Sequence, residues 1–249
     1  QEKNQENMEK TPKIYRPDPW RGEFGWEVMS WAPWCRFHAR DAERVVIESF
    51  AASQPLYADF VTEFIAHDGD TATGRDLKYP KGVGMYHSER AGFRHRRYGR
   101  ANPRWHRHVL LHARAIRRKS AINYRRWPEL VELLAACGYT VAAVGTPADH
   151  CPPGVEDWRG LPLAALMDRL ASAGVVVGAS SGVLHLAAAC GADLVAWGDA
   201  KTRYFETLEQ RYRVTWNPHG VRVGWLDADD WDPDPLWILT AIGTTLNHF

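Results

Sequence analysis

A short turn between two apolar segments carries the residue types that bind phosphate. Residues Val177 to Ala189 read VGASSGVLHLAAA, in which a buried strand ends at Gly178 and a helix begins at about Ser181. The first N–H groups of a helix have no partner inside the helix and carry partial positive charge, so they form an anion site. The residues that could serve this site are Ser180, Ser181, Gly182 and His185.

The same residues also suit an ordinary capped helix. In that interpretation Ser180 is the N-cap, and His185 is a polar residue whose ring has a partner in the core. Gly182 leaves room for a phosphate only in the functional interpretation. Turns of small residues before helices are common, so the spacing alone leaves both interpretations open.

A basic segment forms a second candidate site. Between residues 89 and 126 lie 13 of the 31 Lys and Arg residues of the chain, interleaved with histidines and aromatic residues. Such a concentration of positive charge attracts polyanions, and interleaved aromatic rings can stack on bases. The alternative is a solvated face that is paired with acids from elsewhere. The candidate contacts to nucleic acid or another acceptor are Arg94, Arg96, Arg97, Arg100 and Trp105.

A third candidate site is the sequence GEFGWE at residues 22–27, which follows the first apolar segment. A glycine-containing turn after a strand brings side chains to the carboxyl edge of a parallel sheet, where α/β sites form. A carboxylate there, Glu23 or Glu27, could act as a general base. Either carboxylate could instead only favour the positive end of a helix.

Several other kinds of site are not expected. The four cysteines lack CxxC spacing and the histidines form no zinc motif, so we expect no metal and no cofactor. GxxxxGK[ST] is absent, which argues against a P-loop nucleotidase. No segment reaches the roughly 18 apolar residues that span a bilayer. We therefore expect a cytoplasmic protein with no membrane span, whose residues 1–12 form a disordered leader.

After residue 105, apolar strands alternate with helices of about ten residues. This alternation predicts an α/β fold with a parallel, doubly wound sheet. We expect an N-terminal acceptor-side domain at 13–105 and a C-terminal nucleotide-sugar-binding domain at 106–249. Strands are expected at 44–50, 108–113, 139–145, 175–178 and 192–197, and helices at 26–40, 56–66, 127–137, 163–173 and 181–190.

Residues 108–200 resemble the C-terminal domain of glycosyltransferase family 9, the heptosyltransferase-like enzymes. The resemblance is carried in order by HVLLHA at 108–113, YRRWPEL at 124–130, DWRGLPL at 157–163 and SGVLHLAAA at 181–189. Ser180 stands where the family has an aspartate. The resemblance implies a compact GT-B fold, with two Rossmann-like domains facing across a cleft and the donor nucleotide on the second.

The resemblance also implies roles for individual residues. Ser181, Gly182 and His185 would lie near the donor diphosphate, and Arg125 would replace a phosphate-binding lysine, so that it could form a bidentate clamp. Arg114 and Gly145 complete the expected donor site. The family's base is an aspartate after a glycine, with a proline six residues later. Gly22-Glu23 keeps the dipeptide and Glu27 keeps the spacing to Pro33, so both are candidates and Glu27 is slightly favoured.

Three functions remain open at this point. The first is an inverting, metal-independent glycosyltransferase, a hexosyl- or pentosyltransferase, which transfers a sugar from a nucleotide sugar to a saccharide or small molecule. The second is a DNA-modifying glycosyltransferase that acts on a hydroxymethylated pyrimidine, for which the basic segment argues. The third is a non-catalytic module that binds nucleotide sugar or nucleic acid. The sequence leaves open the sugar, the nucleotide, the acceptor and the oligomeric state.

Overall fold

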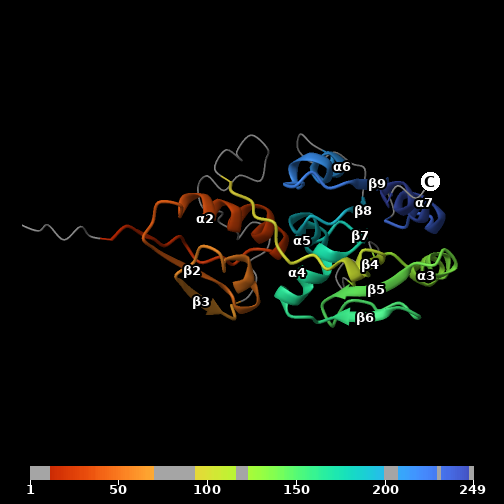
Figure 1. Cartoon of the computed structure of the whole chain (residues 1–249), viewed down its shortest axis with the longest axis horizontal. Coiled ribbons are helices and arrows are strands. Elements are labelled where there is room, and N and C mark those ends of the chain that lie inside the picture. Colours follow the sequence, from red (N-terminus) through yellow and green to blue (C-terminus); the bar gives the residue numbers. More distant parts are fainter. Residues whose placement is uncertain (1–11, 70–92, 116–122, 199–206, 229–230, 247–249) are drawn as a thin grey trace, which may run out of the picture.

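The chain folds into two parallel β-sheets, one of three strands and one of six, with helices packed against each (Figure 1). The computed structural model describes residues 12–69, 93–115, 123–198, 207–228 and 231–246. The predicted α/β class with parallel sheets is confirmed. The sheets lie on either side of residue 105, and the division into domains 13–105 and 106–249 stays a prediction. The predicted leader at 1–12 lies outside the described residues, except for its last residue.

The smaller sheet has the strand order β1-β2-β3, and all its strands are parallel. Its strands are β1 (Ile14–Tyr15), β2 (Arg44–Phe50) and β3 (Glu63–His67). The helix predicted at 56–66 is wrong: a 3-10 helix, η2 (Ala51–Leu56), precedes β3 there. The spacing of apolar residues in this stretch suits either structure, and pairing of residues 63–67 with residues 46–50 of β2 decides for the strand.

The larger sheet has the strand order β6-β5-β4-β7-β8-β9, and every neighbouring pair is parallel. Its strands are β4 (His108–His112), β5 (Thr140–Gly145), β6 (Glu156–Arg159), β7 (Val175–Ala179), β8 (Leu194–Gly198) and β9 (Val223–Asp227). The four central strands were predicted, because strands covered on both faces are almost wholly apolar. The edge strands β6 and β9 were missed, since their exposed positions interrupt that pattern.

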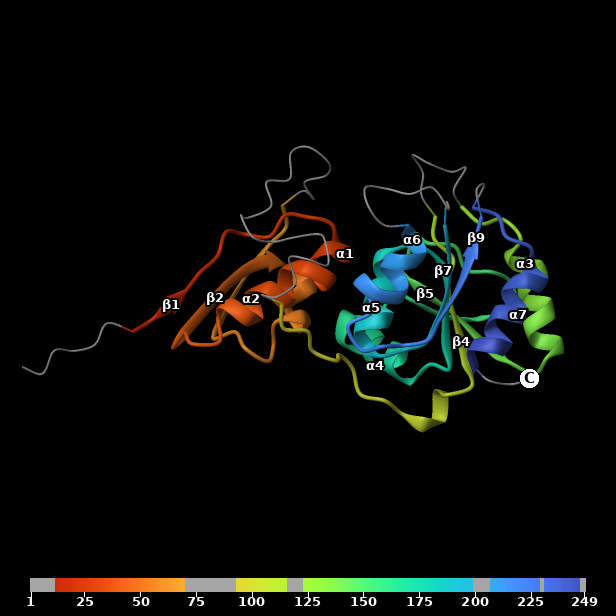
Figure 2. The ribbon, with the colours of Figure 1, turned by 90° about the horizontal axis from the view of Figure 1, so that it is seen from above.

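Helices cover both faces of the larger sheet (Figure 2). On one face lie α3 (Trp127–Ala136) and α7 (Pro235–Leu246), which share a hydrophobic cluster with that side of the strands. On the other face lie α4 (Leu163–Ser172), α5 (Gly182–Cys190), α6 (Leu208–Gln210) and the π-helical turn η7 (Arg211–Thr215). The hydrophobic cluster under α4 and α5 continues into the N-terminal sheet and its helices, so this face joins the two sheets through one core.

The helical segment predicted from residue 26 is present and spans α1 (Phe24–Trp26), the π-helical turn η1 (Glu27–Trp31) and α2 (Ala32–His38). Pro33 is tolerated because it lies in the first turn of α2. Trp31 lies between Trp20 and Trp34, with ring centroids 5.3 Å and 5.5 Å away. This stack of three indole rings anchors the helical segment beside the small sheet.

Residues 93–107 cross from the N-terminal helices to the larger sheet and include the 3-10 helix η5 (Pro103–Trp105) (Figure 1). The buried Arg36 of α2 holds the start of this connection by donating to Arg94 O at 3.1 Å and to Tyr98 Oη at 3.1 Å. Further on, Tyr98 N donates to Ala189 O of α5. None of the helices in the described part of the chain is long and apolar enough to cross a membrane.

Candidate functional site

The turn between β7 and α5 lies at the carboxyl edge of the larger sheet. Ser181 is the N-cap of α5, with extended backbone angles, and its Oγ accepts a hydrogen bond from Leu184 N at 3.5 Å. The sequence had suggested Ser180 as the cap, and the structure shifts the cap by one residue. The remaining N–H groups of the first turn have no acceptor within the helix, so this end of α5 can bind an anion.

Two side chains from other elements hold the Ser180–Ser181 turn. Arg114, which follows β4, donates from Nη1 to Ser180 O at 2.8 Å. The hydroxyl of Tyr212, in the π-helical turn η7, accepts from Ser181 N at 3.2 Å and donates to Ser180 Oγ at 3.1 Å. The turn is therefore fixed from two sides, and a guanidinium group lies beside the helix N-terminus.

A histidine and an aspartate lie directly behind Ser181. His112, the last residue of β4, has its Nδ1 2.8 Å from Ser181 Oγ, and its Nε2 lies 3.6 Å from Asp149 Oδ2. Gly145, at the end of β5, has a φ of +135°, and a Cβ there would meet Asp149 Oδ2 at 2.6 Å. Gly145 thus makes room for the Asp149 carboxylate beside His112, and its role in donor binding stays a prediction.

The electrostatics of this cluster follow from partial burial. Burial alone would raise the pKa of Asp149, but His112 and the N–H groups of Thr146 and Ala115 outweigh it and hold this pKa well below its usual range. For Arg114, burial is the largest effect and lowers the pKa, whereas Tyr212, Asp149 and Glu23 oppose the change.

His185 lies one turn into α5, as predicted, but it is packed rather than open. Its ring stacks on Tyr212 with centroids 5.3 Å apart and lies edge-on to Trp216 at 4.6 Å. Burial, followed by repulsion from Arg114, lowers the pKa of His185 to about 3, so the imidazole is neutral at physiological pH. His185 therefore adds shape and hydrogen-bonding capacity near the anion site but no charge.

Gly182 faces α1, which packs beside the smaller, N-terminal sheet. A Cβ on Gly182 would lie 3.2 Å from Phe24 Cδ1 and 3.4 Å from Gly25 N, and a Cβ on Gly25 would lie 2.8 Å from His185 Cδ2. The expectation that Gly182 makes room for a phosphate is therefore corrected: the space beside its Cα is filled by α1. These two glycines let α1 and α5 approach closely where the units meet (Figure 2).

The two candidate bases have opposite environments. Glu27 has no exposed surface, and its carboxylate accepts hydrogen bonds from Ser49 Oγ, from Ser53 Oγ at 2.7 Å and from Tyr57 Oη at 2.7 Å. Glu23 is exposed and is the N-cap of α1. The slight preference for Glu27 is corrected, because a carboxylate with three internal donors and no exposed surface cannot reach an acceptor hydroxyl in this structure.

Arg125 lies just before α3, on the face of the sheet opposite α5. Its side chain is exposed, and its backbone N–H is 3.4 Å from Asp232 Oδ1. The neighbouring Arg126 is paired with Glu129 at 2.8 Å and with Asp234 at 3.1 Å. The structure therefore does not bring Arg125 into contact with the Ser181 cluster, and Arg114 takes the position beside the helix N-terminus.

The described residues of the basic segment have several separate partners. Arg96 pairs with Asp59 at 3.1 Å, Arg97 packs over Gly191, and Arg100 N donates to Asp168 Oδ1 at 2.7 Å. Arg94 N donates to Pro33 O, and Trp105 lies under the guanidinium of Arg169. These described residues serve the connection between the two sheets. Arg90, Arg117, Arg118 and Lys119 lie outside the described residues.

The sequence interpretation missed His112, Asp149 and Tyr212. His112 is the last residue of β4 and Asp149 lies in the turn after β5, so their positions at carboxyl strand ends were a usable signal. Tyr212 carries no such signal, because it comes from a later turn that tertiary packing brings to the site. In the described part of the chain, no three His, Cys, Asp or Glu side chains are grouped so as to hold a metal ion.

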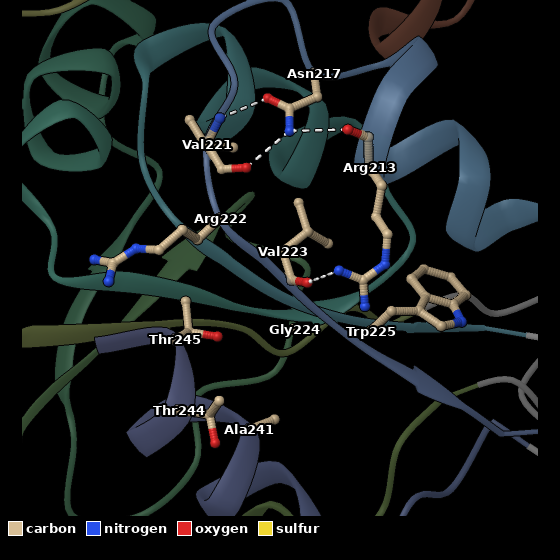
Figure 3. Close-up of a pocket in the computed structure, with 10 residues that line it drawn as sticks. All are labelled: Arg213, Asn217, Val221, Arg222, Val223, Gly224, Trp225, Ala241, Thr244 and Thr245. Atoms are coloured by element: carbon tan, nitrogen blue, oxygen red, sulfur yellow. Dashed lines mark hydrogen bonds between the residues drawn. The ribbon is translucent and has the colours of Figure 1, made fainter. Parts of the chain in front are cut away.

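A separate hollow lies along the edge strand β9, between η7 and α7 (Figure 3). Its polar groups serve the fold: Asn217 Nδ2 donates to Val221 O at 2.8 Å and to Arg213 O at 3.2 Å. Arg213 donates to Val223 O at 2.8 Å, and Arg222 pairs with Asp193. These bonds brace the edge of the sheet, and the hollow lacks the convergent unpaired groups of a reaction site.

Comparison with known proteins gives a match to one family. The sequence model described as glycosyltransferase family 9 (heptosyltransferase) matches residues 123–222, which include α5 and the turn before it. No curated protein matches the chain.

Solved structures are similar over nearly the whole chain. The E. coli ADP-heptose LPS heptosyltransferase II has a TM-score of 0.61 at 15% identity, with 95% of this chain and 99% of that chain covered. The family 9 glycosyltransferase of Veillonella parvula has a TM-score of 0.59 at 11% identity and coverage of 95% and 96%. TibC of enterotoxigenic E. coli, an iron-containing dodecameric heptosyltransferase in complex with ADP-D-β-D-heptose, has a TM-score of 0.59 at 19% identity and coverage of 96% and 78%.

These likenesses confirm the resemblance to glycosyltransferase family 9, the coarse GT-B assignment and the prediction of a glycosyltransferase enzyme. They give no support to the DNA-modifying alternative, since the proteins named above are described as heptosyltransferases or family 9 enzymes. The sugar, the acceptor and the roles of individual residues are not decided by the likeness of fold.

Proposed function

We propose that this chain transfers a heptose from an ADP-linked donor to a hydroxyl group of a saccharide acceptor. The observation that carries the proposal is the N-terminus of α5, with Arg114 beside it and the exposed Glu23 at the start of α1, the helix that packs against α5. The ADP and heptose come from the names of the similar structures, so the proposed sugar is a heptose rather than a hexose or pentose.

In this proposal the donor diphosphate binds at the first turn of α5. The backbone N–H groups, the Ser180 and Ser181 hydroxyls and Arg114 would stabilise the negative charge that develops on the leaving diphosphate. His185 would shape this site as a neutral ring. Arg125 would contribute at most a more distant charge, because it lies before α3.

Glu23 is the proposed general base. It would accept the proton of the acceptor hydroxyl while the acceptor oxygen forms a bond to the anomeric carbon. The bond from that carbon to the diphosphate oxygen then breaks, and its electron pair leaves with ADP. A single displacement of this kind inverts the anomeric centre. We propose that this displacement needs no metal ion. Transferase activity should therefore survive treatment with a strong chelator.

The first test is the thermal stability of the protein with ADP, UDP, GDP and TDP and their sugar conjugates. A ligand that binds the folded state at 100 times its Kd raises stability by about 2.7 kcal/mol. We expect a selective shift with ADP and ADP-heptose, followed by ADP release when a saccharide acceptor is added. A shift in thermal stability with a different nucleotide would change the proposed identity of the donor. No shift with any of these nucleotides would contradict the proposed donor site.

A further inference from the structure

The three side chains Asp149, His112 and Ser181 form a linear array behind the proposed diphosphate site. His112 Nδ1 lies 2.8 Å from Ser181 Oγ, and Nε2 faces Asp149 Oδ2 at 3.6 Å. His112 and Ser181 are buried. The array has no part in proton transfer from the acceptor, because Glu23 fills that role in the proposed function. The array nevertheless limits the directions in which the hydroxyl hydrogen of Ser181 can point.

The Asp149 end of the array is held firmly as a carboxylate. Asp149 Oδ2 accepts from Thr146 N at 2.7 Å and from Thr146 Oγ1 at 2.8 Å, and Oδ1 accepts from Ala115 N at 3.1 Å. A carboxylate facing Nε2 requires a proton on that nitrogen, since two lone pairs would otherwise repel each other. Nε2 of His112 therefore carries a proton whether the ring is neutral or charged.

The groups facing the imidazole come from three elements. Asp149 belongs to the loop after β5, and Ser181 to the N-terminus of α5. Gly145 and Gly178 approach the ring or its Cβ with backbone only. Arg114, two residues further along the chain, is directed to Ser180 O. Asp149 is thus the charged group in contact with His112 within the described residues.

Ser181 Oγ then has two possible arrangements. It already accepts a hydrogen bond from Leu184 N. If His112 is neutral, Nδ1 has a lone pair and Ser181 must donate its hydrogen inward to the histidine. If His112 is protonated, Nδ1–H donates to Ser181, and the serine hydrogen is directed outward to the mouth of the helix. Only the second arrangement lets Ser181 donate to a phosphate oxygen.

We propose that Asp149 and His112 are positioning residues that direct the Ser181 hydroxyl toward the donor diphosphate, and that His112 takes up a proton when the diphosphate binds. The inference rests on the proposed function, because it needs a diphosphate at the first turn of α5. No covalent bond changes, and the proton comes from solvent. The array adds one positive charge behind the site as the negative ligand enters it.

Calorimetric titration with ADP, and with inorganic pyrophosphate as a probe without a base, tests the proposal. The measurement is made at roughly pH 7.5 in buffers of different ionisation enthalpy. For the wild type we expect the apparent binding enthalpy to change with the buffer's ionisation enthalpy, which reports uptake of up to about one proton. His150→Asn, which removes an exposed neighbouring imidazole, should show the same dependence as the wild type.

The variants separate positioning from folding. His112→Asn keeps an N–H donor in place of Nδ1 but cannot titrate, so proton uptake should vanish while affinity stays within about threefold. His112→Ala and Asp149→Asn should each weaken ADP binding about tenfold. The double variant Ser181→Ala/His112→Ala should bind about as weakly as either single variant, since both remove the same donor. A thermal melt of each variant checks that it is folded.

The outcomes distinguish failure of the proposed donor site from failure of the proposed role of Asp149 and His112. Binding of ADP or pyrophosphate to the wild type without proton uptake, or uptake that persists in His112→Asn, overturns the inference and leaves the donor site intact. Absence of binding by the folded wild type overturns the donor site and this inference together. Uptake that is lost in His112→Asn and kept in His150→Asn establishes the array.

Discussion

Two glycine-containing turns, at residues 22–27 and 178–185, connect the same order of structural elements but lie in different environments. In each, a strand or extended segment is followed by small residues and then by a helix. In the turn before α5, the polar groups of Ser180 and Ser181 contact Arg114, His112 and Tyr212 at the carboxyl edge of a six-stranded sheet. In the turn before α1, Glu23 stays outside the helix, whereas Glu27 lies inside a π-helical turn and points at β2.

The difference shows that the position of a charged residue relative to the start of a helix decides whether its side chain is exposed or buried. Glu23 has the extended backbone of an N-cap, so it remains at the exposed end. Glu27 lies one turn later and is buried against three hydroxyl groups. A buried carboxylate is tolerated only when its hydrogen bonds are satisfied, so Glu27 belongs to the core of the small sheet.

The largest expected effect is that of Glu23→Gln on transfer. Removal of a general base lowers the rate by roughly 10² to 10⁴. We expect kcat to fall by that amount while the Kd for ADP stays within about twofold. Glu27→Gln is the matched control and should keep most of the activity per folded molecule. The reverse result would make Glu27 the base and would remove the contrast between the two glutamates.

The next largest effect is on stability and concerns Glu27→Ala. This variant leaves the hydroxyls of Ser49, Ser53 and Tyr57 buried without their acceptor. Each buried unsatisfied group costs about 1–3 kcal/mol, so the free energy of unfolding should fall by about 3 kcal/mol or more. Ser53→Ala, which removes one donor, should cost only about 1 kcal/mol. Chemical denaturation measures both, and equal losses would contradict the network.

The pH dependence of stability provides an independent check. Burial raises the pKa of Glu27 above its ordinary value of 4.5, although Ser49, Ser53 and Tyr57 oppose the shift. The folded state therefore binds this proton more tightly than the unfolded state. Its contribution is fully present below the ordinary value of 4.5 and is lost as the pH rises through the folded-state pKa. Glu27→Gln should remove this part of the profile, and an unchanged profile would show that another group causes it.

The contact between the two turns can be probed with Gly25→Val. Because a Cβ at Gly25 would lie 2.8 Å from His185 Cδ2, either the His185 ring or the packing of α1 on α5 must shift. We expect transfer to fall about tenfold with little change in the Kd for ADP, since a misplacement between reacting groups mainly lowers kcat. Gly182→Val should lower transfer and also raise the Kd for ADP. A loss of ADP binding in Gly25→Val would mean that α1 also holds the nucleotide.

The smallest effects are expected among the arginines. Arg114→Ala should weaken ADP binding about tenfold, because it removes a charged donor beside the helix N-terminus. Arg125→Ala should weaken binding less, and Arg100→Ala, in the connecting segment, should leave it unchanged. Titration of ADP at one salt concentration measures all three. An effect of Arg125→Ala as large as that of Arg114→Ala would restore the predicted clamp.

Much of the larger sheet could be predicted, and less of the smaller one. The strands β4, β5, β7 and β8 are nearly all apolar, and a glycine follows the end of each of the helices α3, α4 and α5, so local pattern and fold agree. In the smaller sheet, the segment 56–66 was predicted to be a helix because its apolar spacing is ambiguous. Pairing of β3 with β2 overrides that local preference.

The candidate site divides in the same way. The sequence by itself determined the α5 turn, the α/β class and the resemblance to family 9, because these depend on contiguous residues and regular periods. Only the tertiary structure decided that Gly182 faces Gly25, that Arg114 rather than Arg125 accompanies Ser180, and that Glu27 is buried. It also brought Tyr212, His112 and Asp149 to Ser181. Contacts between distant segments depend on how helices and strands pack, and no local pattern encodes that geometry.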